Sequence, residues 1–277
     1  MNRHLILLTL ASLVGSFASG AGVVSTNRSS AVRPTRSFAP RPTVDFRQPK
    51  RDYIEWHAGG WTFYLERELA ERESGQARRV VARLEAKVGE VLALLPPHAG
   101  ETLRRLSFYI LLGPRAAGGG YNNGSEYFRR IDPDYHKHLD PRWRSVVVVY
   151  SAENYLWLDD HWAVRVLVHE LAHAWQLERW PERQPDILAA WNSAKEAGLY
   201  RGVKDVNGTP LERAYALQNQ LEYFAELSCA YFWRGEYEPF DRESLRRYDP
   251  KGFAMIEKMW GVRGAPLPPS DRAGQVE

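Results

Sequence analysis

The amino-acid sequence predicts an α+β fold whose second half is helical. Two segments, "WTFYLER" and "LSFYILL", alternate apolar and more polar residues as half-buried strands do, and "SVVVVY" is rich in β-branched residues that favour strands. The segments after residue 159 instead show helical spacing and helix start signals. Strands that come first and helices that follow are typical of α+β domains.

The first half is expected to contain three strands and one long helix. The first strand should lie at 61–67, where Trp61, Phe63 and Leu65 alternate with their neighbours. The helix should cover 76–95 and end at Pro96-Pro97, since Val80, Leu84, Val88, Val91 and Leu95 form one apolar stripe. A strand at 106–112, a glycine-rich loop at 113–124 and a strand at 145–150 should follow.

Three of the four helices expected in the second half have simple boundaries. The first should cover about 160–179, after an Asp-Asp pair suited to an N-cap and before Pro181. The second should cover about 186–197 and end at Gly198. The last is short, at about 253–260.

The remaining helix is expected to begin at "TPLE". Thr209 would be its N-cap, Pro210 its first residue and Glu212 the second member of a capping box. It should run to about Trp233, before Gly235.

The two ends of the chain do not look like parts of a packed domain. Residues 1–22 have a short basic start, an apolar run and small residues, which predicts a secretory signal peptide; an uncleaved anchor is the alternative. Residues 23–51 and 263–277 are rich in polar residues and proline and are expected to be disordered. A domain at 52–262 remains, secreted or held in the cell envelope, with no stable membrane insertion once the signal is cleaved.

Charge and cysteine content narrow the class of protein. The net charge is +3, but residues 21–51 hold seven basic residues against Asp45 alone, so the domain after Arg51 is net negative. We therefore expect no nucleic-acid partner. The single cysteine, Cys229, lies in an apolar helical segment, so it should be a buried thiol, and the fold should have no internal disulfide.

The segment "HELAH" predicts a zinc site. His169 and His173 are four residues apart, so on a helix their side chains share a face and can bind one Zn²⁺. Glu170 is rotated by about 100° from His169, where it can act as a general base on a metal-activated water. A chance match is the alternative, because the pattern is short.

A third ligand has to come from another element. No histidine follows His173, and His161, eight residues before His169, is about 12 Å away along the helix. In "YALQNQLEYFAELS", Tyr215, Asn219, Glu222 and Glu226 would share one helical face. Geometry alone does not choose between the two glutamates as the ligand.

The two segments together resemble the gluzincin metallopeptidases related to the catalytic domain of anthrax lethal factor. That family combines HExxH with a tyrosine seven residues before the ligand glutamate, in the form Y-x6-E-F/Y-F-A-E, a spacing that Tyr215 and Glu222 reproduce. The resemblance covers about residues 146–261. It implies a zincin-like domain, with a small mixed sheet and an active-site helix before the helical C-terminal half.

The resemblance also implies roles for the site residues. His169, His173 and Glu222 would bind Zn²⁺, and Glu226 would orient a ligand histidine from outside. Glu170 would be the general base for a zinc-activated water, and Tyr215 would donate a hydrogen bond to the developing oxyanion or leaving group. The chain is thus expected to be a secreted zinc metallopeptidase acting on a peptide or protein substrate.

Two other functions remain open: a zinc amidase that acts on cell-wall or other non-protein amides, and a catalytically silent zinc-containing binding module. Intact Glu170 and Tyr215 favour an enzyme, because a structural zinc site needs neither. The oligomeric state, the natural substrate and the role of the basic linker do not follow from the sequence.

Other features have plainer interpretations. The strand at 145–150 could be an edge strand that pairs with an extended substrate, although its unbroken valine run favours a fully buried strand. The remaining histidines lack ligand spacing and are expected to be ordinary surface or core residues; they include His57, His98, His136 and His138.

Overall fold

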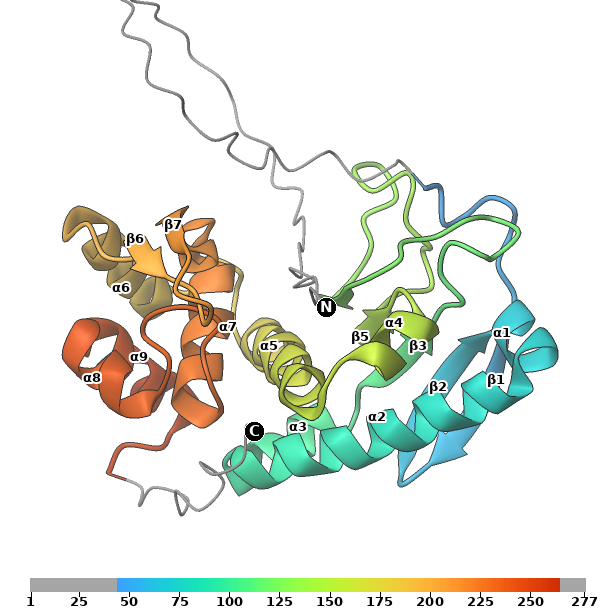
Figure 1. The fold of residues 1–277 in the computed structure, drawn as a ribbon, viewed down its shortest axis with the longest axis horizontal. Helices are drawn as coiled ribbons and strands as arrows, with labels where there is room; N and C mark the ends of the chain where they lie inside the picture. Colours follow the sequence, from blue (N-terminus) through green and yellow to red (C-terminus); the bar gives the residue numbers. More distant parts are fainter. Residues whose placement is uncertain (1–43, 265–277) are drawn as a thin grey trace, which may run out of the picture.

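In the computed structural model, which describes residues 44–264, a five-stranded sheet lies beside a helical second half (Figure 1). The sheet has the order β1-β2-β3-β5-β4. Its central strands β2, β3 and β5 are parallel, whereas β1 and β4 pair antiparallel at the two edges. The predicted α+β class is therefore confirmed. The strands are β1 Tyr53–Ala58, β2 Trp61–Glu66, β3 Ser107–Ile110, β4 Ser125–Phe128 and β5 Val146–Val149.

Helices surround one face of this sheet and form most of the second half. They are α1 Arg67–Arg72, α2 Ser74–Leu94, α3 Pro97–Leu103, α4 Ala152–Trp157, α5 Asp160–Arg179, α6 Pro185–Glu196, α7 Gln220–Phe232, α8 Arg242–Tyr248 and α9 Pro250–Trp260. A hairpin of β6 Arg201–Lys204 and β7 Pro210–Arg213 and a 3₁₀ turn, η1 Tyr215–Leu217, precede α7. The helices expected at 76–95, 160–179, 186–197 and 253–260 are confirmed, with small shifts at their ends.

The valine run of β5 is buried on both sides of the sheet. Val147 and Val149 belong to the large core under the helices. Val146 and Val148 face a second, smaller core with Trp143. A strand that is buried on both faces loses the alternation of polar and apolar residues, which explains the unbroken run.

Helix α5 lies between the sheet and the C-terminal helices (Figure 1). It contacts α2, α3 and β4 on one side and α7 on the other. As a result every residue from Ala163 to Gln176 is buried, including both histidines. Polar groups at these positions must be compensated inside the protein rather than by water.

The helix predicted to start at Thr209 is wrong in its first part. Asp205 Oδ1 accepts hydrogen bonds from the backbone N–H groups of Asn207 and Thr209, at 2.9 and 2.8 Å, and Gly208 has a positive φ of 76°. The chain turns back between β6 and β7 through residues 205–209, with Gly208 in the left-handed conformation that glycine tolerates. The helix starts instead after Asn219, so Tyr215 lies in the turn η1.

The edge role suggested for the strand at 145–150 is also wrong. β5 pairs with β3 on one side and with β4 on the other, so both of its edges are used. The edge strand on this side is β4, which pairs with β5 and with no other strand between residues 44 and 264.

The expected linker ends earlier than residue 51. Phe46 is fully buried in the smaller core, where its ring lies 5.1 Å from that of Trp143. Arg51 is 4% exposed and forms a buried ion pair with Glu66. Residues 46–51 therefore belong to the domain, because Phe46 packs in its core and Arg51 forms an ion pair inside it.

The remaining expectations about the ends of the chain lie outside the described residues. These are the signal peptide at 1–22, most of the basic linker and nearly all of the tail at 263–277. Within 44–264, no helix combines the length and the apolar character needed to cross a membrane.

Candidate metal centre

Helix α5 places two histidines on the side that faces α7. Asp159 caps the helix by accepting a hydrogen bond from the N–H of Trp162 at 2.9 Å, as expected from the sequence. His169 and His173 follow one turn apart, with ring centroids separated by 4.7 Å. Their exposed fractions are 2% and 8%.

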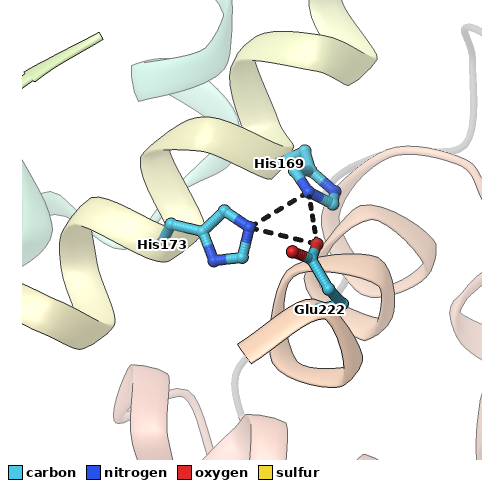
Figure 2. Close-up of side chains that lie close together, drawn as sticks. All are labelled: His169, His173 and Glu222. Carbon is cyan, nitrogen blue, oxygen red and sulfur yellow. Dashed lines mark hydrogen bonds and ion pairs between the residues drawn. The ribbon is translucent and has the colours of Figure 1, made fainter. Parts of the chain in front are cut away.

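Helix α7 brings a carboxylate to the two imidazoles (Figure 2). Its N-cap is Asn219, whose Oδ1 accepts hydrogen bonds from the N–H groups of Leu221 and Glu222 at 2.8 and 2.9 Å. Oε2 of Glu222 lies 3.1 Å from Nε2 of His169 and 3.3 Å from Nε2 of His173. The two Nε2 atoms are 3.1 Å apart.

These three atoms form a triangle of the size that tetrahedral zinc requires. Two ligands at about 2.0–2.1 Å from zinc in tetrahedral directions lie about 3.3–3.4 Å apart. The observed sides of 3.1, 3.1 and 3.3 Å are close to that spacing. Two imidazoles and a carboxylate are also a donor set that zinc accepts. Among the described residues, they are the one group of three or more such side chains with this geometry.

The charges at the triangle favour a cation. Burial would raise the pKa of Glu222, but His173 and His169 hold it well below the usual range. Burial lowers the pKa of His169, yet the groups of Cys229, Glu222 and Glu226 together raise it well above the usual value. The position between these side chains therefore stabilises positive charge, which a metal ion would provide.

Glu170 lies beside the triangle and is fully buried. Its Oε2 accepts a hydrogen bond from the backbone N–H of Tyr127 in β4 at 2.8 Å. Its Oε1 is also buried and has no hydrogen-bond partner within residues 44–264. Burial raises the pKa of this carboxyl to about 8. One oxygen is thus fixed by the edge strand, and the other is available to a ligand of the site.

Glu226 approaches the triangle from behind. Its Oε1 lies 2.9 Å from Nδ1 of His169, which is an ion-pair contact. Glu222 rather than Glu226 faces the Nε2 atoms of both histidines.

Tyr215 joins the site from η1 and not from a helical face shared with Glu222. Its ring centroid lies 6.2 Å from that of His169. Burial, followed by the charges of Glu222 and Glu226, raises the pKa of its hydroxyl far above the usual range. The phenol therefore keeps its proton and can donate a hydrogen bond.

The other histidines do not join this centre. His161 stacks on Trp233, with ring centroids 5.8 Å apart. None of His57, His98, His136 and His138 belongs to a metal-sized group in the described part of the chain. Cys229 is buried and free, as expected.

Two groups that contact the candidate site were not predicted from the sequence. The N–H of Tyr127 had no signal, because β4 is only four residues long and follows a glycine-rich loop. Arg165, whose guanidinium contacts Glu226, did have one: it lies four residues before His169, which places it on the same helical face.

No protein-family model and no curated protein matches the chain.

Proposed function

We propose that the chain is a secreted zinc-dependent metallopeptidase of the gluzincin type. The observation that carries the proposal is the triangle of His169, His173 and Glu222, whose spacing suits one zinc ion. Glu170, buried beside it with one oxygen lacking a partner in the described structure, supplies the group that hydrolysis needs.

In this proposal the protein side chains share the work of hydrolysis. Bound zinc would polarise a peptide carbonyl and make water a better nucleophile. Glu170 takes the proton from the attacking water and passes it to the leaving amine, a task suited to a carboxyl whose pKa burial raises to about 8. Tyr215 donates a hydrogen bond to the oxygen on which negative charge develops.

The position of β4 supports a peptide as the substrate. This edge strand lies against α5, and the N–H of Tyr127 contacts Glu170. An extended peptide can add to a strand edge through main-chain hydrogen bonds. A peptide that paired along β4 would pass beside the general base.

The proposal is tested by digesting a peptide library and, in parallel, a cell-wall preparation with the purified chain, with and without a chelator, and by adding zinc back. Cleavage of internal peptide bonds that the chelator abolishes and zinc restores is the expected result. Hydrolysis confined to cell-wall amides would favour the amidase instead. Zinc binding without hydrolysis of either substrate would favour a silent binding module.

A further inference from the structure

Arg165 is a deeply buried cation beside the site, and the proposed hydrolysis gives it no role. It lies on α5 one turn before His169, and 2% of its surface is exposed. Its Nη2 donates to both oxygens of Glu226, at 2.9 Å to Oε1 and 2.7 Å to Oε2. The same nitrogen lies 3.6 Å from Oε2 of Glu236.

These contacts form a chain from Arg165 to the metal triangle. Arg165 donates hydrogen bonds to both oxygens of Glu226, and Oε1 of Glu226 lies 2.9 Å from Nδ1 of His169. The opposite ring nitrogen of His169, Nε2, faces Glu222 and His173. The direction in which Nε2 points thus depends on how firmly Glu226 is held.

Arg165 also compensates negative charge that is buried at the site. The carboxylates of Glu222 and Glu226 are buried at the triangle. Buried charges are tolerated when opposite charges compensate them. Arg165 compensates the charge of Glu226, and a divalent cation would compensate that of Glu222.

We propose that Arg165 is a positioning residue of the metal centre, which acts through Glu226 to hold the His169 ring so that its Nε2 faces the metal. The inference rests on the proposed function only in requiring that the triangle binds zinc. Without Arg165, Glu226 keeps the contacts with Tyr237 and His169. Neither of these holds both carboxylate oxygens, so the carboxylate can turn away from Nδ1.

The test is a double-mutant cycle on zinc affinity, measured with the full chain by competition against a chromophoric chelator at fixed pH. Arg165→Met and Glu226→Gln should each weaken zinc binding about 10- to 100-fold, the usual effect of losing a partner of a ligand histidine. The double variant should bind zinc no more weakly than Glu226→Gln alone, because both changes break the same chain of contacts.

The matched control is Arg83→Met. Arg83 donates to the backbone oxygens of Leu156 and Leu158 and pairs with Asp160 at the start of α5, but it does not touch the site. Loss of Arg83 should lower thermal stability and leave zinc affinity within about twofold of the wild type. If Arg165 had only a structural role, Arg165→Met would give the same result as this control.

The cycle separates the possible outcomes. Arg165→Met alone could fail to fold, because it leaves the buried carboxylate of Glu226 unpaired. In that case the zinc affinity of the double variant, which has no carboxylate at 226, is compared with that of Glu226→Gln. Unchanged affinity in Arg165→Met or in Glu226→Gln, or losses that multiply in the double variant, would overturn the inference. A wild-type chain that binds no zinc would overturn the proposed metal centre itself.

Discussion

Glu222 and Glu170 are both buried glutamates of the candidate centre, but their surroundings suit them to different tasks. Glu222 faces two imidazoles, which hold its pKa low and keep it anionic. Glu170 faces a backbone N–H, and burial raises its pKa to about 8. Pairs of carboxyl groups with pKa values pushed apart in this way commonly divide ligand, acid and base roles.

The first prediction follows from the role of Glu170. Glu170→Gln should bind zinc as tightly as the wild type and lose peptide hydrolysis by at least about two orders of magnitude, the usual contribution of a general base. Zinc content and turnover of one fluorogenic peptide would be measured on the same preparation. Turnover close to that of the wild type in the zinc-loaded variant would reject Glu170 as the base.

The second prediction concerns Glu222 as a ligand. Glu222→Gln replaces an anionic oxygen with a weaker amide donor, so zinc affinity should fall by more than the roughly 10- to 100-fold that residues behind the ligands contribute. Glu243→Gln on α8 is the control, because the Glu243 side chain is 79% exposed and does not belong to the group of His169, His173 and Glu222. Equal zinc affinity in both variants would mean that Glu222 does not bind the metal.

At the scale of elements, long periodic segments were predictable and short ones were not. The stripe of Val80, Leu84 and Val88 defines α2 within two residues, and Asp159 marks the start of α5. The start of α7 was misplaced, because "TPLE" has the composition of a capping box, whereas the turn at 205–209 makes residues 210–213 the second strand of a hairpin. The hydrogen bonds that Asp205 accepts from its neighbours favour the hairpin over a helix start at Thr209, and the spacing of residues in the sequence does not reveal these bonds.

The third prediction separates the two possible starts of α7. Asn219→Ala removes the side chain that accepts two N–H groups of the helix carrying Glu222, and should lower the free energy of unfolding by about 1 kcal/mol. Asn219→Asp should retain most of the wild-type free energy of unfolding, because a carboxylate can accept the same hydrogen bonds. Thr209→Ala should change it by less than about 0.5 kcal/mol. Urea unfolding of the zinc-free chain measures all three, and a larger loss for Thr209 would restore the earlier helix start.

At the scale of the whole molecule, the two halves meet along α5, and the site lies where they meet (Figure 1). The pairing of His169 and His173 could be predicted from their spacing of four residues. The choice of Glu222 over Glu226 came only from the family resemblance, which places a tyrosine seven residues before the ligand glutamate. The packing that buries Glu170 under β4 could not be predicted, since it depends on contacts between residues 43 positions apart. The start of the domain was misjudged for the same reason, as Phe46 is buried by residues distant in sequence.

The fourth prediction tests where the domain begins. Phe46→Ala should destabilise the zinc-free chain by about 3–5 kcal/mol, the usual cost of emptying a buried aromatic site. Lys50→Ala, an exposed position in the same segment, should change stability by less than about 0.5 kcal/mol. Urea unfolding that gave equal stabilities for the two variants would return residues 44–51 to the linker.

The central claim is that side chains from α5 and α7 together bind one zinc ion. Anomalous scattering at the zinc edge, measured on crystals of the zinc-loaded chain, tests it most directly. The account predicts one strong peak about 2.0–2.1 Å from Nε2 of His169, Nε2 of His173 and a carboxylate oxygen of Glu222. A zinc-saturated crystal with no peak between these three side chains would contradict it.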